Sequence, residues 1–171
     1  MEDKFRRLKA FQGEIDPRKL AYKIAYELNL DDKALKIDDR DDSYNLYYKG
    51  VYGGFGYCTN TTFEVQAETV TKAIRYFWFC KRGFVNNWYG FPFCNDNYDS
   101  ATLDSDIFSI LYMYYVLHIK TYSVSLFYGK EPLNPRLVNI VLRELENKYE
   151  NAEDFLKHAL MGPYPKVLFV S

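Results

Sequence analysis

Residues 104–128 decide the fold, and they read DSDIFSILYMYYVLHIKTYSVSLFY. Within residues 107–119, Ser109 and His118 are the only side chains that are neither apolar nor aromatic. A helix formed from this run would be apolar on every side, and such a helix is buried inside a protein or a membrane. A membrane span needs about 18 or more uncharged apolar residues, but this run soon meets Lys120. We therefore expect the run to form the buried centre of a globular domain.

Two helix starts precede the central run. Asp16 is a good N-cap residue and Pro17 suits the first helical position, and apolar residues at i, i+4 and i+8 then predict an amphipathic helix over 17–29. Thr61 opens a capping box with a glutamate three positions later. This spacing predicts a second helix over 62–82.

Two more helix starts follow the central run. Asn134 before a proline predicts one helix, and Asn151 three residues before Asp154 predicts a restart or a bend. In the helix that starts after Asn134, the spacing of apolar residues predicts which side chains face inward. They are Leu137, Ile140, Val141, Leu145 and Tyr149.

The segment 43–58, SYNLYYKGVYGGFGYC, predicts a β-hairpin, because Tyr, Val and Gly dominate it. Its first half also alternates, since Tyr44, Leu46 and Tyr48 lie between Asn45, Tyr47 and Lys49. Residues 121–128 either extend the central helix or add a strand, and the tail 166–170 reads as a strand. We expect the polar segment 31–42 to be a charged loop. The sum is an α+β fold, mainly helical, in a single domain over 1–171, with a central buried helix near 106–120 and a small antiparallel sheet.

Charge and cysteine content narrow the classes of partner and compartment. The 22 basic and 23 acidic side chains nearly cancel, so no global field attracts nucleic acid or an anionic membrane. The three cysteines are scattered and do not resemble a disulfide framework. No apolar run marks the N-terminus as a signal peptide. We expect a cytoplasmic protein without a membrane partner.

The aromatic share of 19%, with 17 tyrosines, is the strongest functional signal. So many phenols cannot all be buried with hydrogen-bond partners, and exposed tyrosine is typical of binding faces. We expect a non-catalytic protein-binding module, an adaptor or an inhibitor of the kind a virus or mobile element could carry, which acts on another protein or macromolecular complex. A homo-oligomer whose aromatic faces bury one another is an alternative. The expected contact residues are Tyr47, Tyr48, Tyr52, Phe55, Tyr57, Trp88 and Tyr89.

A metal-dependent enzyme acting on a phosphodiester is the first rival hypothesis. Asp104 and Asp106 form an Asp-x-Asp pair that could share a divalent ion with Asp99, although helix capping explains the same residues. The chain contains no Gly-x-Ser-x-Gly elbow, no His-Glu-x-x-His and no P-loop. We therefore favour neither an enzyme nor a metal or other cofactor. We expect His118 to be a hydrogen-bonded core histidine.

Binding of single-stranded nucleic acid is the second rival. The glycines and aromatic residues after Lys49 are similar to strands on which bases stack. The spacing differs, because Val51 and Tyr52 intervene between two glycines of that pattern. Nucleic acid is therefore a partner that the sequence allows but does not favour.

Overall fold

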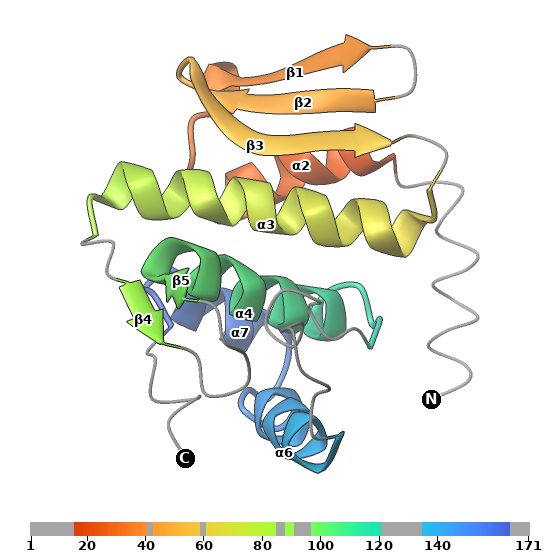
Figure 1. The fold of residues 1–171 in the computed structure, drawn as a ribbon, viewed down its shortest axis with the longest axis vertical. Coiled ribbons are helices and arrows are strands. Elements are labelled where there is room, and N and C mark those ends of the chain that lie inside the picture. Colours follow the sequence, from red (N-terminus) through yellow and green to blue (C-terminus); the bar gives the residue numbers. More distant parts are fainter. Residues whose placement is uncertain are drawn as a thin grey trace.

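The computed structural model describes residues 16–40, 43–58, 61–84, 88–90, 97–120 and 135–164. The fold is α+β and mainly helical, as predicted, and it is layered (Figure 1): a three-stranded sheet covers α2 and α3, then α4 and α7 follow, and α6 lies beyond them. The helices are α2 (Pro17–Glu27), the 3₁₀ turn η1 (Asp32–Ala34), α3 (Phe63–Arg82), α4 (Ser100–Tyr115), α6 (Pro135–Glu146) and α7 (Ala152–Ala159). The strands are β1 (Leu35–Arg40), β2 (Ser43–Tyr48), β3 (Val51–Cys58), β4 (Trp88–Gly90) and β5 (Asn97–Asp99).

The predicted hairpin is confirmed as β2 and β3, which pair in antiparallel register. Lys49 and Gly50 connect them with positive φ angles of 52° and 78°. Two successive positive φ angles characterise the type I′ turn, whose twist suits a two-residue hairpin. The alternation also appears as predicted: Tyr44, Leu46 and Tyr48 are all buried. These side chains form the face of the sheet that covers the helices.

The charged loop predicted at 31–42 is wrong, because η1 and β1 together occupy residues 32–40 and β1 pairs along its whole length with β2. Leu35 is buried and Ile37 is half-buried, whereas Lys36 between them is exposed. Two alternating apolar positions are therefore enough to hold this strand on the core. The strand order β1-β2-β3 puts β1 at an edge of the sheet, and charged residues are common on edge strands because they discourage further pairing.

The helices α2 and α3 both begin close to where the sequence predicts. The Asp16 side chain caps α2 by accepting a hydrogen bond from the Arg18 N–H at 2.9 Å. For α3 the N-cap is Thr62 rather than Thr61, and its hydroxyl accepts from the Val65 N–H at 3.4 Å. The N-cap therefore lies one residue later than predicted, and Thr62 does not form a capping box because Val65 stands three positions after it.

The central helix α4 is buried on nearly every side, as predicted, but it begins and ends earlier than 106–120. The chain leaves the helix after Tyr115 and turns at His118, whose φ angle is 58°. The Ile119 N–H closes this turn on the Met113 carbonyl at 2.7 Å, and Ile119 is still buried. For the residues after Tyr115, the apolar sequence therefore predicted burial of Leu117 and Ile119 correctly and helical structure incorrectly. His118 is exposed, so the core histidine prediction is wrong.

The predicted restart near residue 151 is confirmed, because the Asn151 side chain accepts from the Asp154 N–H at 2.8 Å and caps α7. On α6, Leu145 is buried as predicted, but Ile140 is 46% exposed and does not face inward. The strand predictions for 121–128 and 166–170 lie outside the described residues.

The strands β4 and β5 form a separate antiparallel pair. The strand β5 leads directly into α4, which begins at Ser100.

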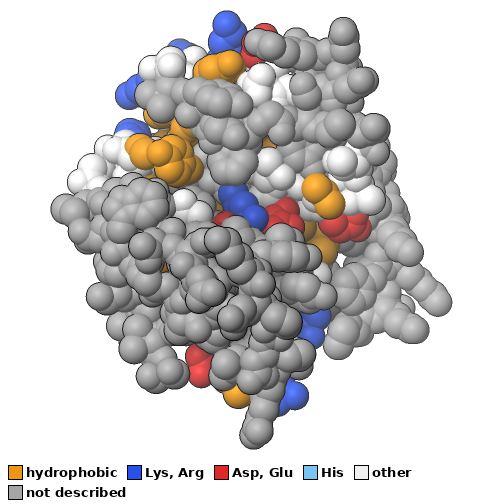
Figure 2. Space-filling model, in the orientation of Figure 1, with side chains coloured by type: hydrophobic (Ala, Val, Ile, Leu, Met, Phe, Trp, Pro, Cys, Tyr) orange, Lys and Arg blue, Asp and Glu red, His pale blue; other side chains and the backbone are white. Residues whose placement is uncertain are grey.

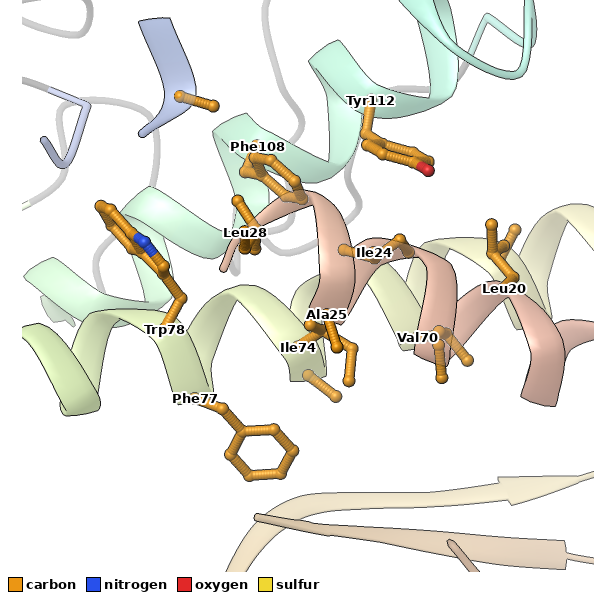
Figure 3. Close-up of a cluster of buried hydrophobic side chains, with 14 of the residues drawn as sticks. Leu20, Ile24, Ala25, Leu28, Val70, Ile74, Phe77, Trp78, Phe108 and Tyr112 are labelled. Atoms are coloured by element: carbon orange, nitrogen blue, oxygen red, sulfur yellow. The ribbon is translucent and has the colours of Figure 1, made fainter. Parts of the chain in front are cut away.

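Buried side chains from α2, α3 and α4 meet in one core (Figure 3). Ile24 and Leu28 come from α2, Ile74 and Trp78 from α3, and Phe108 from α4. Because three helices share this cluster, α2 and α4 are both fixed against α3.

Tyr112 of α4 links this core to α2 through a polar contact, and it yields a pH prediction. Its hydroxyl donates to the Glu27 carboxylate and accepts from Lys23 Nζ at 3.0 Å. Burial, then the negative charge of Glu27 and its hydrogen bond, raise the pKa of Tyr112 well above its ordinary value. The folded state therefore keeps a proton that the unfolded chain loses above about pH 10. We expect the stabilisation from Tyr112 to be complete below about pH 10 and to be lost as the pH rises further.

The measurement is urea denaturation of the wild-type protein and of Tyr112→Phe between about pH 9 and about pH 11. The variant should be less stable by about 1 kcal/mol at neutral pH. The difference in unfolding free energy should shrink by as much as about 1.4 kcal/mol for each pH unit above the unfolded pKa. Two stability curves that stay parallel across this range would contradict the assignment.

Candidate functional site

The predicted contact residues of β2 lie on opposite faces of the sheet. Tyr48 is only 4% exposed, its ring stacks on Phe77 at a centroid distance of 5.7 Å, and its hydroxyl accepts from the Asp31 N–H at 3.2 Å. Tyr48 is therefore a core residue, and its prediction as a contact residue is wrong. Tyr47 alternates with it, is half-buried, and pairs in register with Tyr52.

For the remaining predicted contact residues the structure describes the strands alone. Tyr52, Phe55 and Tyr57 belong to β3, and Trp88 and Tyr89 belong to β4. Their side chains lie outside the described residues, so their role as contacts stays a prediction.

The most exposed aromatic side chains that the structure describes lie on α2, which the sequence prediction did not select. Tyr26 is 80% exposed and Tyr22 is 40% exposed. They are four residues apart, so they share one side of the helix. Lys19 and Lys23 are exposed on the same helix. We call these four residues the α2 tyrosine face: Lys19, Tyr22, Lys23 and Tyr26.

A sequence signal for the α2 tyrosine face exists. Leu20 and Ile24 mark the buried stripe of α2, and a residue two positions further on lies about 200° around a helix from its starting point. Tyr22 and Tyr26 each follow this stripe by two positions, so the helical pattern alone places them in solvent.

The structure separates Asp104 from Asp106, the two described carboxylates among the three proposed to hold a metal. Asp104 is fully buried and faces Arg75 of α3, also fully buried, in a bidentate pair. Arg75 Nε donates to Asp104 Oδ2 at 2.7 Å, and Arg75 Nη2 donates to Asp104 Oδ1 at 3.1 Å. The Tyr164 N–H also donates to Oδ1, at 2.9 Å. Both oxygens of Asp104 are thus occupied by protein donors, which contradicts the metal-ligand hypothesis for this residue.

Asp106 faces a different basic residue, because two positions along a helix amount to about 200° of rotation. Its Oδ1 lies 3.6 Å from Lys72 Nζ, and Lys72 also pairs with Glu68 at 2.8 Å. Asp99 is in β5, and its side chain is not among those described. Across the described ranges, no group of three or more His, Cys, Asp or Glu side chains is arranged to hold a metal ion.

The Arg75–Asp104 pair joins three helices. Arg75 Nη1 donates to the Ala159 carbonyl at 2.9 Å and Nη2 donates to the Gly162 carbonyl at 3.2 Å, at the end of α7. The guanidinium carbon lies 3.5 Å from the centroid of the Trp78 ring. Burial raises the pKa of Asp104, and the charge and hydrogen bonds of Arg75 oppose that shift. These contacts hold α3, α4 and α7 together, so we assign the Arg75–Asp104 pair a structural role.

An open pocket of about 670 Å³ lies where the end of α4 meets the α6–α7 connection. Its volume is in the range of ligand pockets, which is about 300–1,000 Å³. We call it the tyrosine pocket. It is lined by Tyr114, Tyr115, Val116, His118, Glu146, Asn147, Tyr149, Glu150, Asn151 and Ala152.

Tyr115 ties the walls of the tyrosine pocket together. Its hydroxyl donates to the Glu146 carbonyl at 2.7 Å and accepts from the Tyr149 N–H at 2.9 Å. Its ring meets Tyr114 and Tyr149 edge-on, at centroid distances of 5.0 and 5.7 Å. The end of α4 and the segment after α6 are therefore held in a fixed relation.

The described atoms on the face shown in Figure 2 mix hydrophobic, basic and acidic side chains and do not gather into one basic field. None of the described helices is both long enough and apolar enough to cross a bilayer. Comparison of the chain with protein-family models, with curated proteins and with solved structures finds no match.

Proposed function

We propose that this protein is a non-catalytic protein-binding module, an adaptor or an inhibitor, whose contact surface includes the α2 tyrosine face. The observation that carries the proposal is the exposure of Tyr26 and Tyr22 on a helix whose opposite side is buried. Tyrosine offers a large contact area at low entropic cost, and aromatic anchors dominate many interfaces.

The helix beneath these tyrosines is a rigid support. Leu20, Ile24 and Leu28 of α2 are at most 1% exposed. The Leu30 N–H closes the end of α2 on the Ala25 carbonyl at 2.8 Å. Anchors on a fixed helix lose little freedom on binding, and this lowers the entropic cost of association.

Charge indicates the chemistry of the partner. Lys19 and Lys23 are exposed beside the two tyrosines, and Lys23 is already paired with Glu27 at 3.1 Å. Lys19 therefore adds positive charge at the rim of the face. The partner that fits is a protein surface with an apolar centre for the tyrosine rings and carboxylates around it.

The outer face of the sheet is the second part of the proposed surface. Tyr47 is its described member. Apart from this face, the proposal keeps the predicted contact residues of β3 and of β4, which belongs to a separate sheet. These are Tyr52, Phe55, Tyr57, Trp88 and Tyr89. Tyr48 is excluded because it is part of the core.

The experiment is affinity capture from the native host lysate, with and without nuclease, using the full chain and three variants. The α2 variant is Tyr22→Ser with Tyr26→Ser, and the sheet variant is Tyr47→Ser. The matched control is Met161→Ser, which also removes an exposed apolar side chain, 73% exposed, from a different helix end. We expect a stoichiometric protein partner that survives nuclease, is lost or weakened at least about tenfold by the α2 variant, and is kept by the control.

Other outcomes overturn parts of the proposal. Loss of the partner with the sheet variant alone would move the contact surface to the hairpin. Capture that disappears with nuclease would replace protein binding by nucleic-acid binding, with an affinity that falls steeply with salt. Equal capture by all variants would show that neither tyrosine surface is the contact.

A further inference from the structure

We propose that the tyrosine pocket binds an organic cation, an alkylammonium or guanidinium group. Such a group is carried by the lysine and arginine side chains of peptides and by free polyamines. Among the described residues that line the pocket, Glu146 and Glu150 carry carboxylates and none is a lysine or an arginine. The helix ends and the aromatic walls also favour a cation, and Lys120 already places an ammonium group against Glu146.

Helix ends make the pocket more negative. Both α4 and α6 end at it, since Tyr115 and Glu146 are their last residues and both line the pocket. The C-terminus of a helix carries a partial negative charge of about half an elementary charge. The α7 helix begins here with its positive end, but Asn151 caps it and the acidic residues Glu153 and Asp154 occupy its first turn. The helix dipoles therefore favour a cation.

Aromatic walls suit the same ligand. Tyr114 and Tyr149 are half-buried and line the pocket, and a cation over a tyrosine ring is attracted by its quadrupole. Lys148 shows this attraction within the protein, because its Nζ lies 5.9 Å from the centroid of the Tyr149 ring. Burial raises the pKa of Tyr115 and of Tyr149, so these phenols stay neutral at physiological pH.

The pocket is also formed in advance of binding. Tyr115 joins the Glu146 carbonyl to the Tyr149 N–H, as described above. His118 also lines the pocket, at a turn where its φ angle is 58°. A pre-formed site loses less free energy to ordering when a small ligand enters.

Lys120 acts as an internal competitor. Its Nζ lies 3.2 Å from Glu146 Oε1, and its side chain is 48% exposed. An ammonium group is therefore already placed against one of the two pocket carboxylates. Removal of this lysine should leave Glu146 to an external cation, whereas neutralisation of Glu146 should weaken binding. The two substitutions are expected to act in opposite directions.

The experiment measures binding of butylguanidinium to the full chain by NMR titration, with the neutral butylurea as the control ligand. We expect butylguanidinium to shift resonances of His118 and Tyr149, and butylurea to leave them in place. Glu146→Gln with Glu150→Gln should weaken binding by about tenfold or more. Lys120→Met should tighten it by about threefold. Glu144→Gln, on the exposed side of α6 and outside the lining, should change nothing.

Equal binding of butylurea, or an unchanged affinity in the double glutamine variant, would overturn the proposal. A weaker affinity in Lys120→Met would also overturn it, and this variant keeps the test decisive if the glutamine variant folds poorly. Spermidine and the peptide acetyl-Gly-Arg-Gly-amide then separate the two sources of the cation, and tighter binding of either supports the site. Because butylguanidinium needs no protein partner, failure of this test and failure of the α2 surface are independent.

Discussion

Asp104→Asn is expected to lower the free energy of unfolding by about 3–5 kcal/mol. The substitution keeps the shape of the side chain and removes its charge. Arg75 cannot release its proton at any pH that the protein tolerates, so a fully buried guanidinium would lose its counterion. Urea denaturation at neutral pH measures the effect, and circular dichroism in the absence of urea shows whether the variant still folds.

The raised pKa of Asp104 shows that burial of its charge is costly, and this leads to a second expectation for the pair. Burial raises this pKa even though Arg75 opposes the shift, so placing the ion pair in the core has a large desolvation cost. Removing both charges should therefore recover much of the loss. We expect Arg75→Met with Asp104→Leu to be more stable than Asp104→Asn alone, because buried ion pairs are often replaced by apolar residues at little cost.

An exposed ion pair provides the control for Asp104→Asn. Lys120 and Glu146 are 3.2 Å apart and partly exposed, and Lys120→Met should change stability by at most about 1 kcal/mol. A loss of less than about 1 kcal/mol in Asp104→Asn would contradict the assignment, because it would mean that water solvates the Arg75 guanidinium.

The hairpin and the layer of helices were predictable because local chemistry determines them. Three local signals act over only a few residues of sequence. They are the alternation in 43–48, which predicts a strand, the glycine after Lys49, which predicts a turn, and the Asp16–Pro17 pair, which predicts a helix start. The strand β1 was missed because its evidence is non-local. Its many charged residues favour a loop on their own, and only pairing with β2 places Leu35 and Ile37 on the core. The prediction of a single domain over 1–171 stays a prediction.

The candidate site was predicted less well than the fold. Aromatic content indicates that some tyrosines are exposed, but it does not say which ones. Tyr48 and Tyr26 are the same residue type, yet Tyr48 stacks on Phe77 in the core and Tyr26 is 80% exposed. Helical periodicity could have found Tyr26. The Arg75–Asp104 pair joins residues 29 positions apart on two helices, and no local pattern reveals such a pair.

Phe155→Ala is the second change with a large expected effect, again about 3–5 kcal/mol of unfolding free energy. Phe155 of α7 is fully buried. Its ring lies 5.6 Å from Phe108, 5.8 Å from Tyr115 and 5.7 Å from Tyr149, as centroid distances. Truncation to alanine removes these contacts and leaves a cavity between α7 and α4, and the cost depends on how far the helices can close it.

Two variants on the same helix test whether the loss comes from packing at this position, since alanine itself favours a helix. Leu156→Ala removes a neighbouring side chain that is half-buried and should cost about 1 kcal/mol. Phe155→Leu keeps much of the volume and should recover more than half of the loss. Denaturation midpoints with unchanged m-values would show that stability changed and not the extent of unfolding.

The Phe155 ring also connects stability to the tyrosine pocket. It packs on Tyr115 and Tyr149, two of the aromatic residues that line the pocket, and α7 supplies Ala152 at the pocket edge. In Phe155→Ala, the folded protein should therefore bind butylguanidinium more weakly, by about threefold or more, because the walls are no longer fixed. Leu156→Ala should keep wild-type affinity. If Phe155→Ala lost stability and kept full affinity, α4 and the segment after α6 would be sufficient to form the pocket, and α7 would serve the fold alone.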